Sequence, residues 1–380
     1  MRASPSGRVI LLGAAGTTGR LTASAMVRQG LRPVLAGPDE EGLAAMAEDL
    51  APDLPAGHAL EVAQVDSTDP ASIRSLVAST ADVLVSTVGP FTTQGEAPVQ
   101  AAVDAGCGYL DCAWEPPFLR RVYEEFGPSA AQSGALLLPS LGCYYVAGSL
   151  ASTIALRRTM TGSRAPARVD IGYFNTGSAK SGIPGDALIE ESFRWTGGRL
   201  RPERPGARVR TFEIGASKHA DALSLGSAEH FTVPRLAASV TDVNVYVGWF
   251  GRLTRAAAVA GTVGGTASRV LGMGSVWDSM VRGFGTVGGG DGSADPNNPQ
   301  HRTVVVAETY DADGALQQRV RVEGPGPHML TAALLSWGAG MLLQGAASGT
   351  GALGPAEAFG TEALISGCLA LGLAEVHNRY

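Results

Sequence analysis

"VILLGAAGTTGR", residues 9 to 20, decides the fold. Four consecutive apolar residues lead into glycines spaced G-x-x-G-x-x-G, namely Gly13, Gly16 and Gly19, and a helix-forming run follows them. A short apolar run bounded by glycine is typical of a buried strand, and the run after it favours a helix. The stretch therefore predicts a strand, a tight glycine turn and a helix in direct succession, which is the unit that opens a doubly wound α/β domain.

The next 120 or so residues repeat this alternation of apolar runs and helical patterns. Leu43, Met46 and Leu50 recur at helical spacing, and Asp69 followed by Pro70 has the form of a helix cap and a first helical residue. The short apolar runs between the helices look like strands buried on both faces. Because helical crossovers join parallel neighbours, we predict a doubly wound parallel Rossmann-type sheet. Its six predicted strands cover 8–13, 33–37, 61–66, 82–89, 108–113 and 134–139.

The pattern changes after about residue 165. Alternating apolar residues at 242–249, and a hairpin pattern at 302–324 that turns near Asp313 and Gly314, indicate a mixed or antiparallel α+β domain. The glycine-rich stretch 282–300 is predicted to be a loop, and two interpretations stay open for it: a lid beside a substrate cleft, or a plain surface excursion. The residues after 326 return to a helical pattern.

Composition disfavours several classes of function. A formal net charge of -6 and a pI of about 5.6 argue against a nucleic-acid partner, which would need clustered Lys and Arg. The Arg-rich run 199–210 contains Pro, Gly and Glu, so we predict a solvated loop there. The apolar stretch 329–347 is interrupted by Gly, Ser and Gln, so we predict a packed helix and no integral membrane segment. Four cysteines without metal-like spacing indicate no metal site and a reducing, cytoplasmic location.

The three glycines of the opening stretch each have a physical use if the loop holds a dinucleotide. Gly13 permits the tight turn, Gly16 lets the backbone approach a pyrophosphate, and Gly19 allows close packing of the helix on the strand. Free N–H groups at the helix start would face the phosphate charge. The alternative is a plain strand–helix turn that needs flexible residues. Six alternating units behind the motif favour dinucleotide binding.

Four quoted segments carry a family resemblance: "VILLGAAGTTGRLTA", "VDSTDPASIRSLV", "VSTVGPFTTQGEAPVQAAVDAGCGYLDCAWE" and "LLLPSLGCYYVAGSLAS". With them the chain resembles the saccharopine dehydrogenase-like oxidoreductases, which include the trans-acting enoyl reductases. The first half matches in detail and the middle in outline. The resemblance implies a dinucleotide-binding Rossmann domain at 1–148, a substrate and dimerisation domain at 149–326, and C-terminal helices at 327–380 that pack back on the N-terminal domain. It also implies a homodimer.

The resemblance further implies which residues hold an NAD(P) cofactor. Gly13, Gly16, Thr17, Thr18 and Gly19 would hold the pyrophosphate, Asp66 and Ser67 would lie near adenine, and Thr87, Val88, Gly89, Pro90 and Phe91 would line the nicotinamide ribose. The last group follows a central strand, where open parallel sheets bind ligands. A turn with an apolar anchor is the competing interpretation of that group.

The form of the cofactor, NADP or NAD, stays open. Relatives commonly have Ala-Gly-Arg where this chain has Ala-Gly37-Pro38, and Pro38 cannot clamp a 2′-phosphate as an arginine does. Asp39 could accept hydrogen bonds from the ribose hydroxyls of NAD, or it could cap the helix that starts at Glu40. Arg20, at the end of the glycine motif, could still reach a 2′-phosphate. The resemblance favours NADP and the local residues favour NAD.

Three residues are candidates for catalysis: Tyr109, Asp111 and Tyr144. Tyr109 and Asp111 match a family Tyr-x-Asp pattern, while Tyr144 and its neighbour Tyr145 replace an Asp-Ser pair of the relatives. Phenols offer an aromatic wall and a weak acid, so we expect a more apolar or planar substrate, with Tyr144 as the proton donor. The alternatives are core or hinge tyrosines and a structural hydrogen-bond acceptor at Asp111.

The sequence therefore supports one leading hypothesis and one alternative of another class. The first is an NAD(P)H-dependent reductase that transfers hydride to a C=C, C=N or C=O bond of a largely apolar small molecule of lipid or specialised metabolism. The second is a non-redox protein on the same scaffold, such as a cofactor-bound binding module, a partner subunit or a cyclase. Turnover of a reduced nicotinamide separates the two.

Overall fold

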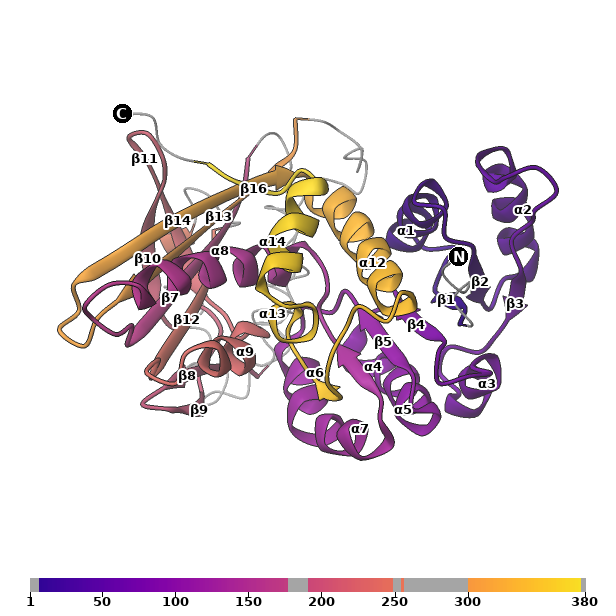
Figure 1. The fold of residues 1–380 in the computed structure, drawn as a ribbon, viewed down its shortest axis with the longest axis horizontal. Helices are drawn as coiled ribbons and strands as arrows, with labels where there is room; N and C mark the ends of the chain where they lie inside the picture. Colours follow the sequence, from indigo (N-terminus) through magenta and orange to yellow (C-terminus); the bar gives the residue numbers. More distant parts are fainter. Residues whose placement is uncertain (1–6, 177–190, 249–253, 256–299, 377–380) are drawn as a thin grey trace, which may run out of the picture. The chain divides into compact units, whose positions relative to one another are not determined.

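The computed structural model describes residues 7–176, 191–248, 254–255 and 300–376. The chain divides into two compact units, and each is described by itself (Figure 1). Unit 1 comprises Met1–Trp114, Phe118–Val146 and His328–Leu371, and unit 2 comprises Glu115–Pro117, Ala147–Pro327 and Gly372–Tyr380. The division into 1–148, 149–326 and 327–380, with a third domain of packed-back helices, stays a prediction.

Unit 1 contains a parallel sheet in the strand order β15-β6-β5-β4-β1-β2-β3. The order reverses between β1 and β4, so right-handed crossovers place the first helices on one face and the later ones on the other. This topology confirms the predicted doubly wound Rossmann-type sheet. The strands are β1 Val9–Leu12, β2 Pro33–Gly37, β3 Val62–Gln64, β4 Val83–Ser86, β5 Gly108–Asp111, β6 Leu136–Leu138 and β15 Gly351–Ala352.

Two strands of this sheet differ from the prediction. The interior strands are buried on both faces, as expected for apolar runs, but β3 is half-buried to exposed along its length. The reason is position: β3 is the edge strand and pairs only with β2. At the other edge β15 was not predicted, because its two residues carry no strand pattern and pair with Leu136 and Leu137 only in the folded chain.

Capping residues in the sequence set where a helix such as α3 begins. Asp69 caps α3 by accepting a hydrogen bond from the Ala71 amide, and Pro70 occupies the first helical position, as predicted. The apolar stretch near the C-terminus forms α12, which packs against β5 through Leu342 and Leu110. The helices with residues in unit 1 are α1 Thr17–Arg28, α2 Glu40–Leu50, α3 Pro70–Leu76, α4 Phe91–Gln94, α5 Glu96–Ala105, α6 Pro116–Arg121, α7 Gly127–Ser133, α8 Cys143–Met160, α12 Pro327–Leu343, α13 Pro355–Phe359 and α14 Thr361–Ala370.

Unit 2 contains a mixed sheet in the order β10-β11-β12-β7-β13-β14-β16, with the hairpin β8–β9 paired to β12. The predicted hairpin of β13 and β14 is present, and its turn has Gly314 at a left-handed φ of 81°. The strands are β7 Arg168–Thr176, β8 Phe193–Thr196, β9 Arg199–Pro202, β10 Val209–Gly215, β11 Lys218–Ser224, β12 Asp242–Val247, β13 Arg302–Tyr310, β14 Leu316–Pro325 and β16 Ala374–Glu375. The helix α9, Glu229–Leu236, contacts β12.

The two faces of this sheet are buried by different contacts. On one face α8 meets the sheet, because the Thr159 hydroxyl lies 2.6 Å from that of Thr309 on β13. On the other, Phe174 and Phe212 belong to a cluster of buried apolar side chains from the strands themselves. Residues 243–247 of β12 are all buried, although the alternation in the sequence predicts one apolar face. Trp249 and all but the last residue of the predicted loop 282–300 lie outside the described residues.

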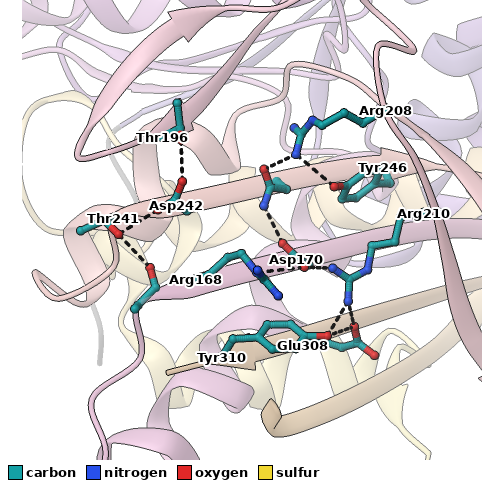
Figure 2. Close-up of polar contacts among 12 residues, drawn as sticks. Arg168, Asp170, Thr196, Arg208, Arg210, Thr241, Asp242, Tyr246, Glu308 and Tyr310 are labelled. Carbon is teal, nitrogen blue, oxygen red and sulfur yellow. Dashed lines mark hydrogen bonds and ion pairs between the residues drawn. The ribbon is translucent and has the colours of Figure 1, made fainter. Parts of the chain in front are cut away.

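The Arg-rich run 199–210 is the predicted loop only in its middle, at 203–208. The strand β9 occupies 199–202 and β10 begins at Val209, so the prediction is wrong at both ends of the run. Arg210 bonds the carboxylates of Asp170 on β7 and Glu308 on β13 (Figure 2). Arg208 donates from two nitrogens to the two carboxylate oxygens of Glu203. The carboxylate partners of Arg210 lie on distant strands and are not revealed by the local composition, whereas Glu203 lies within the run itself.

Candidate functional site

The glycine loop lies at the point where the strand order reverses, between the carboxyl ends of β1 and β4. Gly13 has a left-handed φ of 79°, and its amide donates to the carbonyl of Ala36 at 2.9 Å. A Cβ on Gly13 would lie 2.7 Å from Cγ2 of Val88. Both the φ and the contact require glycine at this position.

Gly16 and Gly19 serve different purposes. A Cβ on Gly19 would lie 2.1 Å from the Gly13 carbonyl oxygen, so glycine allows α1 to pack on the loop. A Cβ on Gly16 would meet only that same oxygen, at 3.4 Å, and Gly16 is exposed. Gly16 precedes α1 without any side-chain cap, and the first amides of a helix have no intrahelical acceptor. The loop is thus a cradle that is open on the side of Gly16, next to the first amides of α1.

The segment after β4 lies beside the glycine loop at the carboxyl edge of the sheet. Val88 is half-buried, and Gly89 and Pro90 are exposed. Phe91 is buried and its ring lies 5.5 Å from that of Phe118. The structure therefore shows a turn with an apolar anchor, and the exposed residues before the anchor are the ones available to a ligand.

The predicted adenosine side is formed by the ends of β2 and β3. Oδ1 of Asp39 accepts a hydrogen bond from the Gly42 amide at 3.1 Å, so Asp39 does cap α2. Asp39 is exposed, and its other carboxylate oxygen can still accept bonds from a ligand. The Gly37 carbonyl accepts from the Val65 amide, which is a structural role.

Arg20 and Asp66 are also exposed at this edge. Nε of Arg20 donates to the Ala15 carbonyl at 2.9 Å. Asp66 accepts bonds from the hydroxyl and the amide of Thr68, and these two bonds lower the pKa of its carboxyl. Ser67 is half-buried next to it. Asp66 therefore presents a charged carboxylate at the predicted adenine position.

Tyr109 and Asp111 are fully buried at the end of β5. Oδ1 of Asp111 accepts bonds from the amides of Ala113 at 2.9 Å and Ser140 at 2.6 Å. Ser140 has a left-handed φ of 61°, so the carboxylate stabilises a turn that is costly for serine. Burial, with the charge of Asp111, raises the pKa of Tyr109 well above 10.0, which keeps it a neutral phenol. These contacts give Asp111 the structural role that was one of its two predicted interpretations.

Tyr144 is half-buried in the first turn of α8. The turn at Ser140 leads directly into this helix, and the Cys143 amide donates to the hydroxyl of Thr331 at 3.1 Å. Its neighbour Tyr145 is fully buried. Since β1, β4, β5 and β6 are parallel, the glycine loop, the segment after β4 and Tyr144 all follow the carboxyl edge of one sheet.

Sequence reasoning missed a buried carboxyl in unit 2. Glu229 has no solvent exposure, and its two oxygens accept bonds from the hydroxyls of Tyr173 and Ser227. Burial raises the pKa of Glu229 to about 7 and lowers the pKa of the adjacent His230 to about 4. The signal in the sequence was weak, because the two donors are separated by 54 positions from one another (227 - 173) and only the fold joins them.

Other classes of site are not formed by the residues that the structure describes. Within those residues, no group of three or more His, Cys, Asp or Glu side chains could hold a metal ion. In the same part of the chain, no helix is both long enough and apolar enough to cross a bilayer. Burial raises the pKa of the Cys107 and Cys368 thiols to about 12, so neither is a ready nucleophile.

Comparison with known proteins gives partial matches in sequence. No protein-family model matches the chain. A protein of Arabidopsis thaliana named probable mitochondrial saccharopine dehydrogenase-like oxidoreductase is 27% identical over 260 residues, which are 62% of this chain and 56% of that protein. The trans-acting enoyl reductase of Mycobacterium ulcerans is 33% identical over 136 residues, which are 35% of this chain and 32% of that protein. The matches thus span about half or a third of these relatives.

Comparison of structures extends the likeness to the fold of the whole chain. Apo saccharopine dehydrogenase (L-Glu forming) from Saccharomyces cerevisiae aligns with a TM-score of 0.58 over 98% of this chain and 99% of that one, at 13% identity. At this identity the alignment establishes the fold and leaves the substrate open. Together the sequence matches and the shared fold confirm the predicted resemblance of this chain to the saccharopine dehydrogenase-like oxidoreductases and the trans-acting enoyl reductases.

Proposed function

We propose that the protein is an NAD(P)H-dependent reductase. The observation that carries the proposal is the cradle at Gly13, Gly16 and Gly19, which is closed by packing at two glycines and open at the third. The first amides of α1 and the open side of Gly16 would hold the diphosphate, and Gly89 and Pro90 would lie toward the nicotinamide end. The bound group would supply a hydride.

We further propose that NADH is the preferred form. Asp39, Glu40 and Glu41 bring three carboxylates to the start of α2, where an NADP-binding relative would present an arginine. A 2′-phosphate there would be repelled, whereas ribose hydroxyls could donate to Asp39. Arg20 of the glycine motif is the competing feature, because its Nε donates to the Ala15 carbonyl while its two terminal nitrogens would still be able to donate to a 2′-phosphate.

The substrate is proposed to be a largely apolar small molecule with a C=C, C=N or C=O bond. Tyr144 supports this proposal, because it is half-buried at the carboxyl edge of the sheet and its phenol can donate a proton. Oδ1 of Asp111 accepts bonds from two backbone amides, so we propose Asp111 as a positioning residue and not as a catalytic group. A cytoplasmic location, a homodimer and the absence of a nucleic-acid partner stay predictions.

The test titrates the protein with NADH and NADPH while following its melting temperature, since a ligand bound by the native state raises it. A matched variant is Gly16→Asp. The residue lies at the cap of α1 with φ -71° and ψ 166°, so aspartate can cap the helix and should keep or raise the apo melting temperature. The aspartate side chain would occupy the open side of the loop and its negative charge would repel a diphosphate, so binding of both dinucleotides should be lost. Gly340→Ala is the control, because a Cβ there meets only Leu31 at 4.0 Å.

Turnover then separates the reductase from the non-redox alternative. A reductase should oxidise NADH in the presence of an apolar enone, imine or carbonyl compound, and Tyr144→Phe should lower kcat without weakening NADH binding. Binding of the dinucleotide without oxidation by any such acceptor would favour the non-redox protein. If neither NADH nor NADPH raises the melting temperature of the wild type, the proposal itself is rejected.

A further inference from the structure

The Gly13 carbonyl oxygen is the point at which the parts of the glycine loop meet. It accepts a hydrogen bond from the Gly16 amide at 3.1 Å. The backbone of Gly19 approaches it so closely that a Cβ there would lie 2.1 Å away. The peptide that follows it is fixed from the other side, where the Ala14 amide donates to Ala36 at 3.3 Å. The orientation of this one peptide therefore sets the path of the loop and the start of α1.

Thr87, on the neighbouring strand end, holds this carbonyl from outside the loop. Its hydroxyl lies 3.1 Å from the Gly13 oxygen and 3.1 Å from the Leu12 oxygen, and its amide donates to Leu12 at 3.0 Å. A hydroxyl has a single proton, which here is shared between two backbone acceptors. Thr87 thus ties the end of β4 to the end of β1 across the point where the strand order reverses.

We propose that Thr87 is a positioning residue, which braces the glycine loop for a diphosphate and does not donate a hydrogen bond to the nicotinamide ribose. This inference rests on the proposed function, since it assumes that the loop binds a dinucleotide. Toward a bound cofactor the Thr87 oxygen can act only as an acceptor, because its proton is used by the backbone. The family resemblance implies that Thr87 lines the nicotinamide ribose, and there its oxygen could only accept a bond from a ribose hydroxyl.

The brace can be removed without leaving a buried acceptor unpaired. In Thr87→Val the shape of the side chain is kept, Leu12 still accepts from the residue 87 amide, and Gly13 still accepts from Gly16. The fold should therefore survive, while the loop gains freedom that a diphosphate must remove on binding. Loss of one neutral hydrogen bond corresponds to about fivefold weaker binding.

The test uses two ligands that share the diphosphate and differ in the ribose. Calorimetric titration of wild type, Thr87→Val and Thr87→Ser with NADH and with ADP measures both affinities. Thr87→Val should weaken the affinities for NADH and for ADP by the same factor, about fivefold. Thr87→Ser keeps the hydroxyl and should bind both ligands as the wild type does. Thr22→Val is the control, because it also removes a buried hydroxyl that bonds a backbone carbonyl, at 2.8 Å within α1.

The outcomes distinguish this inference from the proposed function. If Thr87→Val weakens NADH but leaves ADP unchanged, Thr87 contacts the nicotinamide half and the brace is refuted. If both affinities stay at the wild-type value, the brace is refuted although dinucleotide binding stands. If the wild type binds neither ligand, both proposals fail. Equal weakening together with a lack of turnover would uphold the brace and reject only the reductase.

Discussion

Replacing Glu229 by glutamine should change how stability depends on pH. In the wild type this buried carboxyl has a folded-state pKa of about 7 and an ordinary value of 4.5. The folded pKa is the higher one, so the protonated form favours folding. The stabilisation of the folded state by the raised pKa of Glu229 is fully present below about pH 4.5 and is lost as the pH rises through about 7. Glutamine carries no titratable proton, and Glu229→Gln should lack this dependence.

The size of the effect follows from the two pKa values. They differ by 7 - 4.5, or about 2.5, which at about 1.4 kcal/mol for each pH unit gives a ceiling of about 3 to 4 kcal/mol. At pH 5 the unfolded carboxyl is mostly charged while the folded one is mostly neutral, so about 2 to 3 kcal/mol is still present; at pH 8 nearly none is left. The hydroxyls of Tyr173 and Ser227 favour the charged form and reduce the shift that burial alone would cause.

Urea denaturation of wild type and Glu229→Gln at pH 5, 6, 7 and 8 measures this difference. The gap in unfolding free energy between the two proteins should change by about 2 to 3 kcal/mol between pH 5 and pH 8, in the direction that makes wild type relatively weaker at pH 8. Glu48→Gln, at an exposed position of α2, should run parallel to wild type. Parallel curves for Glu229→Gln, or a gap that grows in the opposite direction, would refute the assignment of a buried neutral carboxyl.

Three further predictions concern unit 1. Gly19→Ala should lower the melting temperature and dinucleotide affinity together, because its Cβ would lie 2.1 Å from the Gly13 oxygen; a fully stable variant that binds NADH would contradict the packing described. Asp39→Asn should keep the cap of α2 and the melting temperature while raising NADPH affinity relative to NADH, which parallel titrations would measure. Asp111→Asn should fold, because one amide oxygen can accept both bonds made by Oδ1, whereas Asp111→Ala should lose about 2 to 4 kcal/mol in urea denaturation; equal stability of these two variants would speak against the structural role.

The fold of unit 1 was predictable because its signals are local. Asp69 and Pro70 mark the start of α3, and the glycine spacing predicts the tight turn between β1 and α1. The edge position of β3 was not predictable from its own residues, since exposure depends on which strands lie beside it. The two-residue strand β15 is set by pairing with β6 and by nothing in its own pattern.

The polar interior of unit 2 shows a second limit. Arg208 and Arg210 lie in a run whose Pro, Gly and charge are typical of a loop, yet both cations are bonded to carboxylates. Asp170 and Glu308 are 138 positions apart (308 - 170) and become neighbours only because β7 and β13 pair in register. Local composition shows only that these side chains prefer water. Whether a charged side chain is buried in the folded protein depends on whether the fold brings a partner of opposite charge next to it.

The candidate site shows how a residue of a matched motif can act through the backbone that it holds. In the Tyr-x-Asp pattern of β5, Asp111 has no solvent exposure and its Oδ1 accepts bonds from the amides of Ala113 and Ser140. Those bonds maintain the left-handed turn from which α8 starts, and α8 carries Tyr144. Asp111 can therefore be indispensable to the orientation of the proposed proton donor without touching a substrate. Sensitivity of turnover to its replacement would not by itself make it catalytic, and the contrast between its asparagine and alanine variants is what separates position from chemistry.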